Sequence, residues 1–275
     1  MIDRPKFKEL RYYDGMSIPQ EYDIVQLKMD GMWGCMVMSC GEWNIYSRTG
    51  KLKASGHLDT YEKDETIILG EYMKNSHWAH RHDCDGHFYA FDCVKYKGQD
   101  LTEEPLAERL DTLNRYVLHN ETLGFIYPLN TWHVSDWETV WKEYVDEGYE
   151  GLVFKNSSSF YSDKNAWARM KTVVEVDYTC VGFRPADKGT RYEGQVGAVI
   201  GTLADKEVYV TCGGLTDTQR RLFTEKPDSQ IGVVFTAKGN GWYPSGSIRH
   251  PKFKMWRYDK TPEECTFDQI PEEYR

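Results

Sequence analysis

Short runs of β-branched and aromatic residues, each ended by turn residues, dominate the first two thirds of this sequence. The run Ile24–Lys28 stops at Asp30-Gly31, and residues 36–43 contain the turn pair Cys40-Gly41, which predicts a hairpin. Because the same residue types are enriched in strands, further strands are expected later in this region. They fall at residues 66–73, 88–96 and 152–155. The region is therefore expected to be rich in β-structure.

Two segments of this region have a helical pattern. A first helix is predicted over residues 104–119, where apolar residues recur at helical spacing. A second is expected to begin at Ser135, with Glu138 completing a capping box, and to end at Gly148. The stripe of the first helix consists of Leu106, Leu110, Leu113 and Val117.

Beyond residue 173 the sequence predicts a second, smaller domain. Its expected strands lie at residues 173–183, 197–203, 207–212 and 231–237. One short helix is expected near residues 217–223, with Thr216 as its cap. About five strands with one short helix fit a small Greek-key barrel of the OB type. We therefore expect an α+β protein with domains at residues 1–173 and 174–275.

Length and composition agree with this division. A chain of 275 residues suits two domains of ordinary size. It contains no run of eighteen apolar residues, and its first ten residues lack the apolar core of a signal peptide. The seven cysteines are scattered and include no C-x-x-C pair, which is typical of reduced thiols. We expect a cytoplasmic monomer without a membrane partner.

The net charge of -9 argues against a general basic coat for nucleic acid. The excess of acids lies in residues 1–175, whereas residues 176–275 carry as many cations as anions. Because a cleft focuses the field of nearby charges, a basic groove remains compatible with the acidic total.

The tetrapeptide Lys28-Met29-Asp30-Gly31 is the first of an ordered series of motifs. Alone it predicts only a strand end followed by a turn. Its meaning depends on the segments that follow it. They are SRTG (47–50), LGEY (69–72), FYAFD (88–92), EGLVFK (150–155) and WARMK (167–171).

This series resembles the nucleotidyltransferase motifs shared by ATP-dependent DNA ligases, RNA ligases and mRNA-capping enzymes. The resemblance covers residues 26–171 and implies an adenylation domain built from ATP-grasp-like antiparallel sheets. Residues 194–203, 210–220 and 247–266 look like the OB domain of DNA ligases. The R-x-D-K element at Arg257, Asp259 and Lys260 is especially similar to that of cellular and phage DNA ligases. The resemblance thus favours a compact, phage-type ATP-dependent DNA ligase.

The resemblance implies a three-step reaction. Lys28 takes AMP from ATP, AMP passes to a DNA 5′-phosphate, and the 3′-hydroxyl displaces AMP to seal the nick. An attacking amine has to be unprotonated, although the pKa of a free lysine is about 10.4. We expect Lys155, Lys171 and Mg²⁺ to surround Lys28 and favour its neutral form. The partner is nicked double-stranded DNA.

Other roles follow from the same resemblance. Glu150 is the expected Mg²⁺ ligand, and Glu71 holds the ribose or assists the metal. Phe91 is expected to stack on adenine, and Arg48 to contact sugar or phosphate. The remaining nucleotide-binding positions are Gln26, Leu27, Lys155 and Lys171. Arg257, Asp259 and Lys260 are expected to orient pyrophosphate in the first step only, which requires the OB domain to close over ATP and reopen.

Three positions depart from the family pattern. Trp33 stands where an arginine is usual, Gln26 where a glutamate is usual, and Arg169 where a lysine is frequent. The amide of Gln26 can still bond an adenine edge. The substitution at Trp33 places the usual guanidinium contact in question.

One tract outside the motifs is rich in metal-ligand residues. It contains His77, His80, His82, Cys84 and His87. Such a tract can bind Zn²⁺, but its spacing matches no closed zinc site, and a polar surface loop is the preferred interpretation.

Two other functions are considered. One uses the same lysine chemistry, and the other lacks it. An RNA ligase or a capping-type enzyme would use the same lysine, but Gln26 and the DNA-ligase-like tail favour ATP and DNA. A catalytically silent OB-fold binder would form no covalent protein-AMP. Because Lys28 lies near the start of the chain, we expect a minimal two-domain enzyme whose grip on DNA is weak and sensitive to salt.

Overall fold

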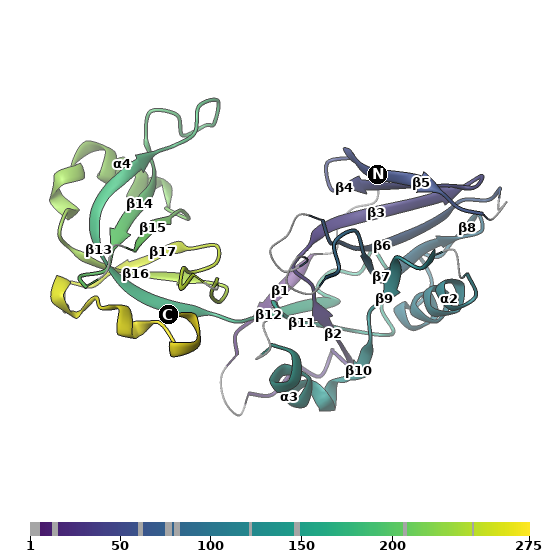
Figure 1. Cartoon of the computed structure of the whole chain (residues 1–275). Coiled ribbons are helices and arrows are strands. Elements are labelled where there is room, and N and C mark those ends of the chain that lie inside the picture. Colours follow the sequence, from purple (N-terminus) through teal and green to yellow (C-terminus); the bar gives the residue numbers. More distant parts are fainter. Residues whose placement is uncertain are drawn as a thin grey trace. The chain divides into compact units, whose positions relative to one another are not determined.

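The computed structural model describes residues 6–12, 16–59, 63–74, 79, 83–120, 123–145, 149–205, 208–243 and 245–275. The chain forms two compact units, Met1–Lys171 and Thr172–Arg275. Figure 1 draws both, coloured along the sequence. None of the helices within these described ranges is long and apolar enough to cross a bilayer.

The first unit contains a five-stranded sheet, called here the motif sheet. Only the pair at one edge, β1 with β12, is parallel; the other neighbours are antiparallel. The strands, in spatial order, are β1 (Phe7–Leu10), β12 (Trp167–Lys171), β11 (Gly151–Lys155), β2 (Ile24–Lys28) and β10 (Thr131–His133). The strands predicted at residues 24–28 and 152–155 are confirmed.

A larger sheet completes the first unit. Its hairpin between β3 and β4 turns at Cys40 and Gly41, whose φ angles of 52° and 76° are those of a tight left-handed turn. The strands predicted at residues 66–73 and 88–96 are confirmed. The order is β5 (Leu52–His57), β4 (Glu42–Ser47), β3 (Met32–Ser39), β6 (Thr66–Tyr72), β7 (Phe88–Tyr96) and β8 (Gln99–Asp100), with β9 (Ile126–Pro128) parallel to β7.

The first predicted helix is confirmed as α2 (Leu106–Leu118). It lies along β7 and β9, as Figure 1 shows. Leu106, Leu110 and Leu113 are buried in the core that α2 shares with the larger sheet. The apolar spacing of the sequence therefore identified the packed face of this helix.

The second predicted helix is only partly correct. A 3-10 turn (Val134–Asp136) leads into one α-helical turn, α3 (Trp137–Val140), and a π-helical turn (Trp141–Val145) follows. Ser135 does not cap it, because its hydroxyl pairs with the His133 ring and with Asp136. Residues 146–148, including the expected stop at Gly148, lie outside the described residues. The buried residues of this segment cover one face of the motif sheet.

The second unit is a five-stranded antiparallel sheet that curls toward closure. The peptide N–H of Phe253 on one edge strand donates to the Gly213 carbonyl beside the other edge strand at 2.9 Å. The predicted strands are confirmed, and β17 was not predicted. The order is β15 (Tyr209–Cys212), β14 (Val196–Thr202), β13 (Val174–Pro185), β16 (Val234–Gly239) and β17 (Lys252–Trp256).

The short helix of this unit is α4 (Asp217–Glu225). Thr216 caps it in a reciprocal capping box with Gln219, as the sequence indicated for Thr216. Phe223 of α4 is buried among the aromatic residues of the sheet. The two units together form the expected α+β architecture.

Candidate active site

Alternation along three neighbouring strands gives the motif sheet one apolar face and one functional face. Side chains at every second position share a face, and directly paired residues of antiparallel strands point to the same side. The apolar face belongs to the core covered by α3. It carries Val25, Leu27, Leu152, Phe154, Ala168 and Met170. The opposite face carries Gln26, Lys28, Val153, Lys155, Trp167 and Lys171.

Lys28 and Lys171 meet through one carboxylate. Both pair with Gly151, which lies between them on β11. Glu150, the residue before Gly151, accepts from Lys28 through Oε2 and from Lys171 through Oε1. The side chain of Glu150 is only 6% exposed, so the two ammonium groups supply the charge compensation that a buried carboxylate requires.

Glycine is required between the two lysines. Gly151 has a φ of 150°, and an added Cβ would lie 2.0 Å from the carbonyl oxygen of Met170. A side chain at this position would therefore push β12 away from β11. The glycine lets the backbone turn Glu150 toward Lys28 and Lys171.

The electrostatics of the cluster reflect burial and charge. Burial acts to raise the pKa of Glu150, but the charges of Lys28 and Lys171 outweigh it and hold that pKa below its usual value. Burial lowers the pKa of Lys171, against the opposing influence of Glu150. Glu150 is therefore ionised at neutral pH and holds both amines in place.

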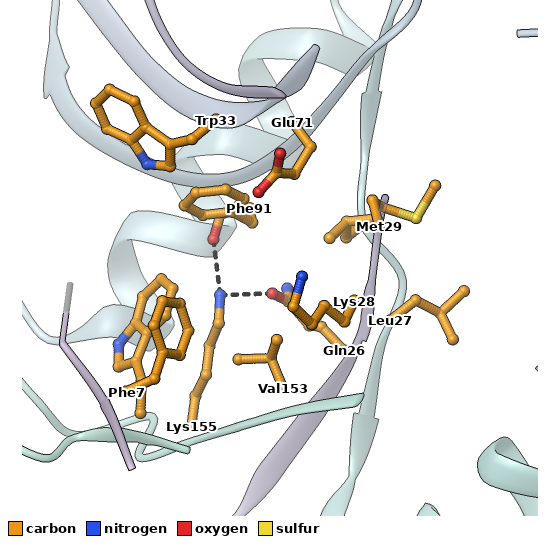
Figure 2. Close-up of a pocket in the computed structure, with 12 residues that line it drawn as sticks. Phe7, Gln26, Leu27, Lys28, Met29, Trp33, Glu71, Phe91, Val153 and Lys155 are labelled. Atoms are coloured by element: carbon orange, nitrogen blue, oxygen red, sulfur yellow. Dashed lines mark hydrogen bonds between the residues drawn. The ribbon is translucent and has the colours of Figure 1, made fainter. Parts of the chain in front are cut away.

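Lys155 occupies a different part of the functional face. It pairs with Ile24, four residues along β2 from Lys28, and its ammonium donates to Gln26 Oε1 at 2.6 Å and to the Phe91 carbonyl at 3.1 Å (Figure 2). The nitrogen lies 3.7 Å from the centre of the Trp167 ring. Burial lowers the pKa of Lys155 to about 7. Lys155 therefore lines the same pocket as Lys28, and its amine is bound by neutral groups further along the strand.

Gln26 is held in one orientation. Its oxygen accepts from Lys155, and its Nε2 donates to Thr131 Oγ1 at 2.8 Å on the neighbouring strand β10. Both ends of the amide are engaged, and the residue is 1% exposed. The sequence predicts a bond from Gln26 to an adenine edge. Such a bond would have to use the second N–H or the second lone pair of the same amide.

A partly open pocket lies over this face. Its lining comes from both sheets of the first unit: Phe7, Gln26, Leu27, Lys28, Met29, Trp33, Glu71, Phe91, Leu129, Val153, Lys155 and Trp167. Figure 2 shows Phe91, Trp33 and Glu71 on the side opposite Lys155 and Val153. Ring faces on two walls and amines on the floor suit a flat base attached to an anion.

The larger sheet supplies three of these residues. Trp33 on β3 pairs with Glu71 on β6, and Phe91 follows on β7. Trp33 is 7% exposed, and its indole N–H has no hydrogen-bond partner among the described residues. The residue that replaces the family arginine is therefore an apolar wall of the pocket with one N–H group.

Leu27 and Arg48 were also predicted to contact the nucleotide, but their side chains are less directly placed for it. The side chain of Leu27 belongs to the apolar face and points away from Lys155 in Figure 2, which leaves its backbone for the pocket. Arg48 is exposed in the turn after β4. Arg169, which shares its strand with Lys171, pairs with Glu9 at 2.7 Å.

Sequence reasoning missed a buried ion pair behind Phe91. Asp92 and Arg109 are both fully buried and form two hydrogen bonds, of 2.8 and 3.0 Å. Arg109 also donates to the carbonyls of Glu104 and Ser159. The pair fastens α2 to β7 and to the turn after β11. An arginine on the apolar stripe of α2 was the signal in the sequence.

The R-x-D-K residues lie in the second unit. Arg257 is held by Asp259 through two bonds of 2.8 and 2.7 Å, and Lys260 follows in the same turn after β17. Asp177 on β13 accepts from both Arg257 and Lys260. Asp177 was not predicted, although an acid within an apolar strand was visible in the sequence.

The described residues contain no group of three or more His, Cys, Asp or Glu side chains that could hold a metal ion. His77, His80 and His82 of the histidine-rich tract lie outside the described residues. Cys84 of that tract is buried, and burial raises its pKa. Glu71 lines the pocket, and Glu150 holds the amine of Lys28, which also lines it.

Comparisons with known proteins relate part of this chain to DNA ligases. Residues 62–171 match the model described as ATP dependent DNA ligase domain. A DNA ligase of Natronomonas pharaonis is 30% identical over 218 residues, covering 68% of this chain and 38% of that protein. The DNA ligase of Enterobacteria phage T3 is 28% identical over 143 residues, covering 46% of this chain and 39% of that protein. The chain spans 38 to 40% of the length of the first DNA ligases it matches.

Solved structures agree in fold. One, described as "DNA binding with a minimal scaffold: Structure-function analysis of Lig E DNA ligases", has a TM-score of 0.66 at 16% identity and covers 94% of this chain and 100% of that chain. Another, "Pmar-Lig_PreS3", has a TM-score of 0.66 at 20% identity and covers 91% and 67%. The expected fold class, an adenylation domain followed by an OB domain, is confirmed. Residues 62–171 thus match an ATP dependent DNA ligase domain, and the chain is similar to DNA ligases in sequence and in fold.

Proposed function

We propose that this protein is an ATP-dependent DNA ligase that seals nicks in duplex DNA through a lysyl-AMP at Lys28. The observation that carries the proposal is the position of Lys28. Its amine lies at the pocket floor, on the face shared with Gln26 and Lys155, and beside the Glu150 carboxylate that also holds Lys171. A lysine in this setting can form a covalent bond to a nucleotide held by the pocket walls.

The proposed reaction has three steps. Lys28 Nζ attacks the α-phosphorus of ATP, a nitrogen–phosphorus bond forms, and the bond to the leaving pyrophosphate breaks. An oxygen of the DNA 5′-phosphate then attacks the same phosphorus and releases the lysine. Finally the 3′-hydroxyl attacks the 5′-phosphorus, the phosphodiester forms, and AMP leaves. Lys28 loses a proton before its attack, and the carboxylate that accepts its hydrogen bond is Glu150.

The donor set fits Mg²⁺, the metal expected for this chemistry. Mg²⁺ keeps several waters and uses one or two carboxylates together with substrate phosphates. Glu71 lines the pocket, and Glu150 is bound to the Lys28 amine. When bound, it would neutralise phosphate charge. Lys171 keeps Glu150 oriented when Lys28 turns to the nucleotide, because the two lysines use different oxygens of the carboxylate.

The far end of the pocket is proposed to hold adenine. Phe91 supplies a ring face, and Gln26 and Lys155 supply polar groups fixed by their mutual bond. Glu71 is proposed to bind the ribose or assist the metal, and Arg48 to contact sugar or phosphate. Arg257, Asp259 and Lys260 are proposed to orient pyrophosphate, which requires the second unit to close over the pocket in the first step.

Labelled nucleotides test this proposal. Wild-type protein incubated with Mg²⁺ and ATP labelled in the α-phosphate is expected to retain label, and a nicked duplex is expected to discharge it as the nick is sealed. Lys28→Ala is expected to retain none. Lys164→Ala, which removes a lysine of the first unit outside the motif series, is the matched control. Label from GTP alone, or discharge by nicked RNA alone, would instead favour the capping or RNA-joining alternative.

A further inference from the structure

Asp177 is a buried carboxylate of the second unit that none of the roles above uses. It lies on β13, is 6% exposed, and pairs across the sheet with Thr236 of β16. Thr236 Oγ1 donates to Asp177 Oδ1 at 2.5 Å. A buried charge is costly unless it is paired, so the other oxygen needs a cation.

Asp177 has its two cations on that other oxygen. Oδ2 accepts from Lys260 Nζ at 2.6 Å and from Arg257 Nη1 at 3.3 Å. These are the two cations of the R-x-D-K element. Because they share one oxygen atom, their head groups lie close enough for a single phosphate group to reach both.

The carboxylate is fixed independently of the cations that it holds. The peptide N–H of Asp177 donates to Gln269 Oε1 at 2.9 Å, and Gln269 Nε2 donates to the Asp177 carbonyl at 3.1 Å. Together with Thr236, these bonds determine where Oδ2 points. The position of Oδ2 is therefore set by the sheet and by the C-terminal segment.

The cations, in contrast, lie in a turn and would repel each other without a counter-ion. Arg257 follows β17 directly, and its peptide N–H donates to the Val234 carbonyl at 2.8 Å. Asp259 engages Nε and Nη2 of Arg257. The side chains of Arg257 and Lys260 remain 27% and 29% exposed, so part of each head group faces solvent.

We propose that Asp177 is a positioning residue that holds Arg257 and Lys260 side by side as a two-cation grip for the pyrophosphate released when Lys28 is adenylated. The inference rests on the proposed function. It assigns to Asp177 a part in lysyl-AMP formation only. Sealing of a nick that already carries a 5′-adenylate needs no pyrophosphate grip and is independent of Asp177.

Asp177→Asn tests the proposal because it removes the charge and keeps the shape. Single-turnover formation of lysyl-AMP from ATP is expected to slow by about ten- to a hundredfold, the range that a misplaced positioning group produces. Sealing of a pre-adenylated nick is expected to stay within about twofold, since only the first step needs the grip. Glu175→Gln is the matched control, because Glu175 lies on the same strand and pairs with Lys254 at 2.6 Å, outside the R-x-D-K element.

A double-mutant cycle separates positioning from general loss of structure. If Asp177 acts only through the two cations that it holds, then adding Asp177→Asn to a protein that already carries Arg257→Ala and Lys260→Ala is expected to leave the rate of lysyl-AMP formation unchanged. Independent, additive losses would overturn the proposal, as would equal losses in both reactions or a wild-type rate in Asp177→Asn. A wild-type protein that forms no lysyl-AMP would overturn the proposed function itself, which distinguishes the two failures.

Discussion

Two regions of the molecule use the same device, a buried carboxylate that holds two cations. In the first unit Glu150 holds Lys28 and Lys171, and in the second Asp177 holds Arg257 and Lys260. The difference lies in what holds the cations.

Lys28 and Lys171 lie on strands whose register places them on either side of Gly151. Arg257 and Lys260 lie in a turn after β17, and their carboxylate comes from β13. The first cluster is therefore set by backbone geometry, and the second depends on its carboxylate. The comparison predicts that backbone changes damage the Glu150 cluster most, whereas a charge change suffices to disperse the Asp177 cluster.

The largest loss of stability is expected from a change at a third ion pair, which is more deeply buried than either cluster. Asp92→Asn leaves Arg109 fully buried without its counter-ion, and such a change lowers the free energy of unfolding by about 3–5 kcal/mol. Urea unfolding measures it. Asp111→Asn, which breaks the exposed Asp111–Arg115 pair on the same helix, is the control and is expected to leave the midpoint unchanged. Equal effects of the two changes would contradict the assignment of Asp92 and Arg109 as a structural clamp.

Gly151→Ala tests whether backbone geometry sets the Glu150 cluster. The added Cβ meets the Met170 carbonyl and the φ of 150° disfavours alanine, so a loss of about 3 kcal/mol in unfolding free energy is expected, with loss of lysyl-AMP formation. Gly182→Ala on β13 is the control, because no heavy atom lies within 4 Å of its added Cβ. A Gly151→Ala protein as stable and active as Gly182→Ala would show that register does not determine the cluster.

Lys155 differs from the cations of both clusters, because its amine is bound by neutral groups. Its folded-state pKa of about 7 lies below its unfolded value near about 10.4, so the unfolded state binds more protons between these values. Stability is therefore expected to rise with pH across this window, by at most about 1.4 kcal/mol per pH unit from this group.

The measurement compares urea unfolding of wild type and Lys155→Met at about pH 7.5, 8.5 and 9.5. These values lie between the folded and unfolded pKa values of Lys155. The free energy of unfolding of the wild type is expected to rise more steeply with pH than that of Lys155→Met, since the charged amine is the form that burial penalises. Parallel pH profiles would mean that Lys155 is not perturbed by burial. Asp177→Asn completes the series, because its expected effect on rate is confined to the formation of lysyl-AMP.

Most of the fold was predictable because its signals are local. The strand Ile24–Lys28, the turn at Cys40-Gly41 and the stripe of α2 follow from residue alternation, turn chemistry and helical spacing. The helix expected at Ser135 failed in its details because His133 and Asp136 engage the serine hydroxyl that would have capped it. Competing side-chain partners of this kind are not visible in a spacing pattern.

The site was predictable as a set of residues but not as a set of contacts. Alternation places Gln26 and Lys28 on one face, but only the register between β2 and β11 shows that Glu150 reaches Lys28 and that Lys155 lies beside Gln26. Asp177 was missed for the same reason, because it lies about eighty residues from the cations that it holds. Non-local pairing determines both clusters.

The most direct test of the account is to locate the adenylyl group after incubation of the wild-type protein with ATP and Mg²⁺. Acid-labile nucleotide linkages are preserved at alkaline pH, and peptide mapping by mass spectrometry then identifies the modified lysine. One adenylyl group is expected, on Lys28, with Lys155 and Lys171 unmodified. A protein that carries no adenylyl group, or carries it on Lys155 or Lys171 in place of Lys28, would contradict it.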